Sequence, residues 1–147
     1  MSSASIHPGP PLVGALLRMP VDHVRAHMLR ALQEHGFGDV TSAHFQVLRW
    51  PPPDGERPVD LAARANMSKQ AMNYLLGQLE GLGYLERRVD PDDVRSRRVY
   101  LTERGTATIG VVRTAVAELE ADWERRLGTA DWQELKRLLV RLNDVVD

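Results

Sequence analysis

The chain has 147 residues, of which 43% are hydrophobic and 27% are charged, and this is the composition of one ordinary globular domain or two very small ones. The absence of cysteine excludes disulfides, thiolate catalysis and any zinc site that needs sulfur ligands. Apolar runs are too short to span a bilayer, and the first residues lack a basic segment followed by an apolar one. We therefore expect no membrane span and no secretory signal, and a cytoplasmic protein fits these features.

The charge is small overall but unevenly distributed. The net charge of −1 is not that of a typical nucleic-acid-binding protein. Residues 57–105, however, carry 9 basic and 7 acidic side chains, whereas both flanks are acidic. Five arginines lie between Arg87 and Arg98. A basic middle segment is therefore the part of the chain in which an anionic partner would bind.

The N-terminal third predicts a tail and two helices. Residues 1–11 are rich in proline and predict a loose tail. From Leu12, apolar residues recur at intervals of three and four, which predicts a helix that kinks or restarts at Pro20 and ends at Gly36. A short helix should follow Thr41, and the three prolines from Pro51 should stop it.

The middle of the chain predicts two helices joined by a tight turn. Pro58 suits the first turn of a helix, and Ser68 is a good N-cap for a second helix that ends near Gly81. Asn66, which lies between them, tolerates the left-handed backbone conformation that such a turn needs. Val59 and Ala71 are predicted to face the interior with the other apolar residues of these helices.

A β-hairpin is predicted next. Residues 84–89 and 97–101 read as strands, with the turn-rich residues 90–93 between them. Two helices, a tight turn and a hairpin together describe a winged helix-turn-helix.

Two long helices should end the chain. Thr102 can cap a helix of about 25 residues, whose apolar stripe includes Val112, Val116, Leu119 and Leu127. Thr129 can cap a last helix with a second stripe. A small winged domain does not need this much apolar surface, so we expect a second copy of the chain to cover it and to set two DNA half-sites about 10 bp apart. The side chains assigned to dimerisation are Leu16, Leu17, Val24, Trp132, Leu135, Leu139 and Leu142.

The second helix of the central pair has a polar face at its start. Recognition helices contact base edges with their N-terminal residues, Gln and Asn match adenine, and Lys suits guanine. The residues predicted to contact DNA from this helix are Ser68, Lys69, Gln70, Asn73, Tyr74 and Gln78. They are also compatible with an ordinary solvated surface.

The hairpin supplies a second predicted contact. An arginine at a hairpin tip can enter a narrow minor groove, where the negative potential is enhanced. The aspartates would repel phosphate unless they are paired, so Asp93 is expected to orient Arg95. The residues assigned to the wing are Asp93, Arg95, Arg97 and Arg98.

Four segments of the chain form a recognisable combination and read LAARANMSKQ from Leu61, LEGLGYLER from Leu79, DPDDVR from Asp90 and LTERG from Leu101. Together they resemble the MarR family of bacterial transcriptional regulators. The resemblance implies a mainly α fold with a small β-hairpin, in which residues 41–102 form the winged helix-turn-helix and residues 12–40 and 103–147 form an intertwined homodimer.

The family resemblance also carries expectations about function. It implies repression or activation at palindromic DNA, often relieved by a small molecule, with Asp93 and Arg95 matching the wing Asp-x-Arg pair and Arg95 as the minor-groove residue. Two positions depart from the family pattern: Val94 stands where a basic residue is frequent, and Asn66 stands where glycine is common.

A small-molecule pocket is expected where the winged region meets the dimer helices. Its candidate lining residues are Met28, His44, Phe45 and Trp50, which are equally compatible with plain core packing.

Three other functions have less support in the sequence. A metal-responsive regulator is suggested by His23 and His27 at i, i+4, but no Cys or carboxylate completes a cluster, so no metal and no cofactor are expected. A winged domain that binds only protein is an alternative, although its surface should hold aromatic anchors. No catalytic motif is present, so an enzyme is not expected.

Overall fold

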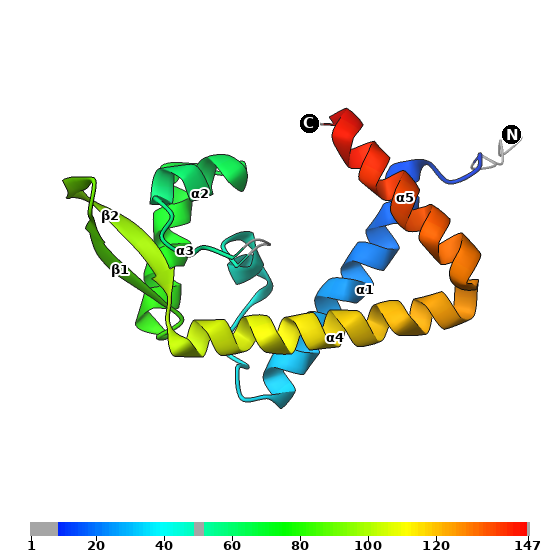
Figure 1. Ribbon diagram of the computed structural model, residues 1–147, viewed down its shortest axis with the longest axis horizontal. Helices are drawn as coiled ribbons and strands as arrows, with labels where there is room; N and C mark the ends of the chain where they lie inside the picture. The colour runs from blue at the N-terminus through cyan, green and yellow to red at the C-terminus, as the bar shows by residue number, and fades with distance from the viewer. Residues whose placement is uncertain (1–8, 49–51, 147) are drawn as a thin grey trace, which may run out of the picture.

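The computed structural model of the chain describes residues 9–48 and 52–146. Figure 1 shows α4 as a long helix, with the hairpin and α2–α3 at its N-terminal end, α1 crossing it and α5 folding back from its C-terminal end. The fold is mainly α with one small antiparallel hairpin, as the sequence predicts. The elements are α1 Val13–Glu34, η1 Ser42–Gln46, α2 Pro58–Arg64, α3 Lys69–Gly81, β1 Leu85–Asp90, β2 Asp93–Leu101, α4 Glu103–Leu127 and α5 Thr129–Val146.

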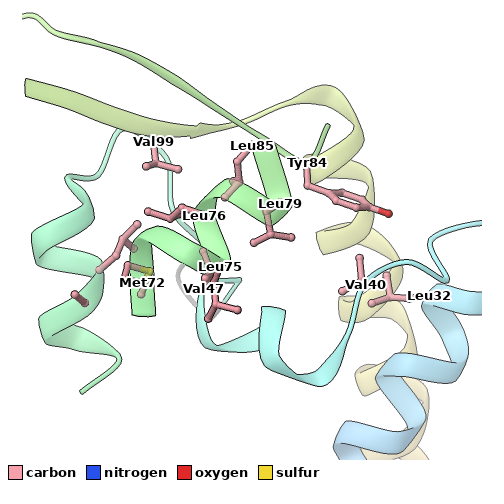
Figure 2. Close-up of a cluster of buried hydrophobic side chains, with 12 residues drawn as sticks. Leu32, Val40, Val47, Met72, Leu75, Leu76, Leu79, Tyr84, Leu85 and Val99 are labelled. Carbon is pink, nitrogen blue, oxygen red and sulfur yellow. The ribbon is translucent and has the colours of Figure 1, made fainter. Parts of the chain in front are cut away.

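The main hydrophobic core lies inside the winged region. Leu76 and Leu79 of α3 are buried together with Leu85 of β1 and Val99 of β2, and Figure 2 shows these side chains between the helix and the hairpin. Leu32 of α1 joins the same cluster. Helix α3 is therefore held on its inner side by the hairpin and by the segment after α1, which leaves its polar face outward.

Local caps confirm the predicted helix boundaries. Asn66 has a φ of 51°, so it takes the left-handed conformation predicted for the turn between α2 and α3. The Ser68 hydroxyl accepts a hydrogen bond from the backbone N–H of Ala71 at 3.1 Å, and the Thr102 hydroxyl accepts one from Gly105 at 3.0 Å. These caps fix where α3 and α4 begin.

The hairpin is longer and its turn tighter than predicted. Strand β2 begins at Asp93 rather than Arg97, β1 extends to Asp90, and these two aspartates pair across the sheet. An irregularity in the register between Val89 and Asp90 accommodates the turn. Arg95, expected at the tip of the hairpin, therefore lies within β2. The turn-rich composition of residues 90–93 concealed this strand pairing in the sequence.

The structure narrows two predictions about the first helices. Helix α1 does not restart at Pro20 but continues from Val13 to Glu34. The missing N–H deprives only the Leu16 carbonyl of its partner, on an exposed part of the helix where water can replace it. The predicted helix after Thr41 is only a five-residue 3₁₀ helix, η1.

Some apolar side chains predicted to face inward are exposed. Val59 is 43% exposed and Ala71 is also exposed, because α2 and α3 each turn only one narrow face to the core. On α4, Leu119 is buried as predicted, whereas Val112 and Val116 are only half-buried. Helix α1 crosses only part of α4, so much of the apolar stripe of α4 is not covered by other helices of the same chain.

Candidate DNA interface

The first turn of α3 presents two free polar side chains. Lys69 and Gln70 are exposed, and within residues 9–48 and 52–146 neither side chain forms a hydrogen bond or ion pair. The capped start of the helix holds their backbone rigidly, since Ser68 is engaged in the N-cap. Both side chains are therefore available to acceptors and donors of a partner.

Asn73, predicted to contact DNA, is engaged within the domain. Its Oδ1 accepts a hydrogen bond from Arg87 Nη1 at 3.1 Å, and its Nδ2 donates to the Lys69 carbonyl at 3.0 Å. Arg87 also bonds Glu80 at 3.0 Å. A bidentate contact from Asn73 to adenine would first have to break these bonds.

Tyr74 and Gln78 form a hydrogen-bonded pair. Gln78 Nε2 donates to the Tyr74 hydroxyl at 3.0 Å, and Gln78 Oε1 lies 3.1 Å from His44 Nε2. Tyr74 is 67% exposed, whereas His44 is 3% exposed. Gln78 is thus occupied by intramolecular partners, and Tyr74 is the member of the pair that faces outward.

In the wing, Asp93 organises the backbone beside Arg95. The Asp93 carboxylate accepts hydrogen bonds from the Arg95 backbone N–H at 3.1 Å and from Ser96 Oγ at 3.2 Å. The Arg95 guanidinium Nε lies 3.7 Å from the same carboxylate, and the side chain is 91% exposed. Arg95 is consequently a projecting cation whose starting direction is set by Asp93.

Arg98 differs from Arg95 because it is held in an ion-pair network. It lies 3.0 Å from Asp90 and 3.1 Å from Asp92, and its side chain is only 28% exposed. Asp90 is fully buried and also pairs with Arg57 at 2.8 Å. The backbone N–H of Asp92, together with the two guanidinium groups, lowers the pKa of Asp90 to about 2. Arg98 is therefore held against the turn between β1 and β2 rather than projecting from the wing.

A cationic groove joins the helices to the wing. It has a volume of about 260 Å³ and lies between the starts of α2 and α3 and strand β2. Lys69 and Arg97, both predicted from sequence, line it together with Arg57 and Ser96. Arg57 and Ser96 were not predicted from the sequence. Their place in the groove depends on where β2 begins, and the turn-rich composition around Asp93 concealed that start.

A polar cluster connects this interface to the long helices. The Tyr84 hydroxyl donates to Asp39, and Arg104 of α4 contacts that hydroxyl at 3.0 Å and Asp39 at 3.3 Å. Burial, followed by the hydrogen bond to Asp39, raises the pKa of Tyr84 to about 12. The hydrogen bond from Tyr84 lowers the pKa of Asp39. The loop after α1, the hairpin and α4 are thereby joined at one point.

The predicted ligand-lining residues that the structure describes do not line either of the cavities of about 630 Å³ and about 260 Å³. His44 is buried against Gln78, Met28 and Phe45 are half-buried, and Trp50 lies outside the described residues. A cavity of about 630 Å³ lies instead between α1 and α4. Its lining includes His27, Arg30, Glu34, Thr114 and Glu118.

The residues predicted for dimerisation differ in how far a single chain buries them. Leu16 is 56% exposed and Leu135 is 39% exposed, whereas Trp132 is buried with its ring centroid 6.1 Å from that of Trp123. The remaining members of the set are half-buried, namely Leu17, Val24, Leu139 and Leu142.

The histidine pair is divided in the same way. His23 packs beside Trp123, with ring centroids 6.0 Å apart, and His27 lines the cavity between α1 and α4. Across residues 9–48 and 52–146 there is no group of three or more side chains that could hold a metal ion. No helix in this same part of the chain is long and apolar enough to cross a membrane.

Comparison with curated proteins identifies relatives among transcription regulators. An uncharacterized HTH-type transcriptional regulator of Bacillus subtilis, YkoM, is 30% identical over 82 residues, which are 56% of this chain and 52% of that protein. The HTH-type transcriptional repressor Rv2887 of Mycobacterium tuberculosis is 33% identical over 88 residues, which are 60% of this chain and 63% of the repressor. The matched segment thus spans between half and two thirds of these relatives.

Solved structures extend the similarity to most of the chain. The crystal structure of the Mycobacterium tuberculosis MarR family protein Rv2887 in complex with salicylic acid is 32% identical, covers 90% of this chain and 97% of that one, and superposes with a TM-score of 0.62. The transcriptional repressor CouR bound to a 23-mer DNA duplex has the same fold, with a TM-score of 0.68, 23% identity and coverage of 90% and 92%. A model of the MarR family matches residues 56–96. The chain belongs to the MarR family of transcription regulators.

Proposed function

We propose that the protein is a homodimeric, sequence-specific DNA-binding regulator that represses transcription at palindromic operators. The observation that carries the proposal is the pair of exposed, unbonded side chains Lys69 and Gln70 at the rigid start of α3, beside a wing that projects Arg95. Lys and Gln supply the donors and acceptors that read base edges in the major groove. The cationic groove lined by Arg57 and Arg97 suits the adjacent phosphates.

DNA binding and dimerisation are assigned to different parts of the chain, following the arrangement in Figure 1. We assign DNA binding to residues 41–102 and dimerisation to residues 12–40 and 103–147. Exposed apolar side chains gather on the N-terminal half of α1 and along α5, and a second copy of the chain would cover them. These side chains include Leu12, Val13, Leu16, Met19, Leu135, Leu138, Val145 and Val146. Because transcription is regulated at the bacterial chromosome, this role places the protein in the cytoplasm.

Two relatives support the finer parts of the proposal. Rv2887 and CouR are both named as repressors, and CouR was solved on a DNA duplex. Rv2887 was solved with salicylic acid, so we propose that a small molecule releases this protein from DNA as well. The cavity between α1 and α4 is the place we assign to that molecule, since it lies between the helices that set the spacing of the two winged regions.

The test is selection of DNA fragments from a random-sequence library by the pure protein, followed by sequencing. We expect an inverted repeat whose half-sites lie about 10 bp apart. The variant Gln70→Ala should return a motif that is relaxed at one position in each half-site, while Gln133→Ala on the exposed surface of α5 should return the wild-type motif. Retention of no duplex at low ionic strength would reject the proposal and favour a domain that binds only protein.

A further inference from the structure

A chain of three hydrogen bonds leads from the backbone N–H of Thr41, through buried His44, to the exposed hydroxyl of Tyr74. The Thr41 N–H donates to His44 Nδ1 at 3.0 Å, His44 Nε2 lies 3.1 Å from Gln78 Oε1, and Gln78 Nε2 lies 3.0 Å from the Tyr74 hydroxyl. His44 is 3% exposed and Tyr74 is 67% exposed. The chain therefore connects the interior of the winged region to the outer face of α3.

The direction of every bond in this chain is fixed by its first donor. A backbone N–H can only donate, so His44 Nδ1 must accept and carries no proton. The single proton of the neutral imidazole is then on Nε2, which donates to the carbonyl oxygen of Gln78. The Gln78 side-chain amide is thereby oriented with its NH₂ group toward Tyr74. An NH₂ group can only donate, so the Tyr74 oxygen accepts.

The consequence is a tyrosine hydroxyl whose hydrogen points away from the protein. One lone pair of the Tyr74 oxygen is occupied by Gln78, and the O–H is left to donate outward. Tyr74 lies four residues after Gln70, so both side chains share one face of α3. Duplex DNA offers hydrogen-bond acceptors to the outer face of a recognition helix, namely phosphate oxygens and the N7 and O6 atoms of guanine.

We propose that His44 is a positioning residue that, through Gln78, presents the Tyr74 hydroxyl as a hydrogen-bond donor to an acceptor atom of DNA. This inference rests on the proposed DNA-binding function and adds a contact that is selected for polarity. A site that orients a donor in advance favours acceptors at that position, because the same hydroxyl facing an amino group of adenine or cytosine would leave two donors opposed. His44, which is buried and remote from the DNA face, thus contributes to the choice of sequence.

A double-mutant cycle tests the connection between Gln78 and Tyr74. Tyr74→Phe, Gln78→Met and the double variant are titrated by fluorescence anisotropy against a duplex selected by the wild-type protein. We expect Tyr74→Phe to weaken binding by about fivefold to tenfold, and Gln78→Met to weaken it less. The double variant should bind no more weakly than Tyr74→Phe alone. Gln133→Met, which makes the same exchange on the exposed surface of α5, should bind as the wild type does.

A second substitution tests the polarity itself. Gln78→Glu replaces the NH₂ donor by a carboxylate oxygen, which accepts from Tyr74 and turns its hydroxyl hydrogen inward. The added negative charge weakens DNA binding in any background. We therefore expect the loss of affinity to be about fivefold greater with Tyr74 present than in the Tyr74→Phe background. Equal losses in the two backgrounds, or multiplicative effects of Gln78→Met and Tyr74→Phe, would overturn the inference.

The tautomer of His44 is measurable in the unmodified protein. We expect ¹⁵N NMR of the histidine ring to show the proton on Nε2, and a proton on Nδ1 would contradict the proposed polarity. Repeating the Tyr74→Phe titration on a duplex of scrambled sequence identifies the acceptor: an equal loss on both duplexes assigns a phosphate oxygen, and a loss confined to the selected duplex assigns a base. Failure of the wild-type protein to select any duplex would reject DNA binding itself, whereas normal selection with additive variants would reject only the positioning of Tyr74 by His44 and Gln78.

Discussion

Side chains on the outer face of the winged region differ in whether ion pairs within the protein fix their position. Arg95 projects into solvent beside Asp93, whereas Arg98, three residues further along β2, is held by Asp90 and Asp92. The two arginines were equivalent in sequence, because both lie in the same basic hairpin. Their roles separate only when the buried position of Asp90 is known, and that position depends on Arg57, which is 33 residues away.

Arg95→Ala should weaken DNA binding without changing stability. A projecting guanidinium that contacts the minor groove and its phosphates contributes about one counterion equivalent or less per subunit to the salt dependence. We expect a flatter plot of log affinity against log salt concentration, together with loss of A·T preference next to the half-site. Fluorescence anisotropy over a series of salt concentrations measures both effects, and an unchanged affinity would show that the wing stays clear of DNA.

Asp90→Asn should destabilise the protein in a manner that depends on pH. The pKa of Asp90 is lowered to about 2 in the folded protein from 3.8, so its ionised form favours the folded state. That contribution is fully present above about pH 4 and is lost as the pH falls through about 2. Urea unfolding should therefore show a clear loss of stability in Asp90→Asn near neutral pH and a much smaller difference from the wild type near pH 2.

The exposed neighbour Asp92 provides the control for that experiment. Its side chain is 74% exposed, so Asp92→Asn should change the unfolding midpoint far less than Asp90→Asn at neutral pH. A difference between Asp90→Asn and the wild type that stays constant down to about pH 2 would contradict the role assigned to the buried carboxylate.

At the scale of elements, the sequence predicts what local chemistry decides. The turn at Asn66 and the caps at Ser68 and Thr102 were predictable, because each involves residues within a few positions along the chain. The start of β2 was not predictable, because it depends on pairing across the hairpin. The engagement of Asn73 and Gln78 was hidden for the same reason, since their partners Arg87 and His44 lie 14 and 34 residues away.

The junction between β1 and α4 gives a prediction about glycine. A Cβ added to Gly105 would overlap the carbonyl oxygen of Tyr84, which already accepts a hydrogen bond from the Thr102 N–H. We expect Gly105→Ala to lower the free energy of unfolding by about 1–3 kcal/mol. Gly77, in the middle of α3, has nothing within 4 Å of such a Cβ, and Gly77→Ala should raise the free energy of unfolding by about 0.5–1 kcal/mol. Denaturant titrations in which both variants behave alike would contradict this account of the junction.

At the scale of the whole molecule, α4 separates two kinds of surface. One end carries the polar face of α3 and the wing, and the other carries the exposed apolar stripes of α1 and α5 (Figure 1). The cluster of Asp39, Tyr84 and Arg104 joins the hairpin to the loop after α1 and to the start of α4, so the winged region is tied to the helices that we assign to dimerisation. Sequence periodicity indicated these stripes but not which of their residues a single chain buries, as Trp132 illustrates.

Leu135→Glu should prevent the proposed dimer from forming. Leu135 is 39% exposed on α5, so a charge there is tolerated by one folded chain but must be buried when a second copy covers the stripe. We expect the dissociation constant of the dimer to rise by about a hundredfold or more. Size-exclusion chromatography with light scattering at several concentrations measures the change, and Gln133→Glu, on the exposed surface of α5, should remain dimeric.

Sedimentation equilibrium of the pure protein, alone and with a selected duplex at low ionic strength, tests the central claim that two copies of the chain read one duplex together. The account predicts a species of twice the 16.5 kDa chain mass in the absence of DNA, and a complex of two chains per inverted repeat in its presence. A species of 16.5 kDa that does not sediment with any duplex would contradict it.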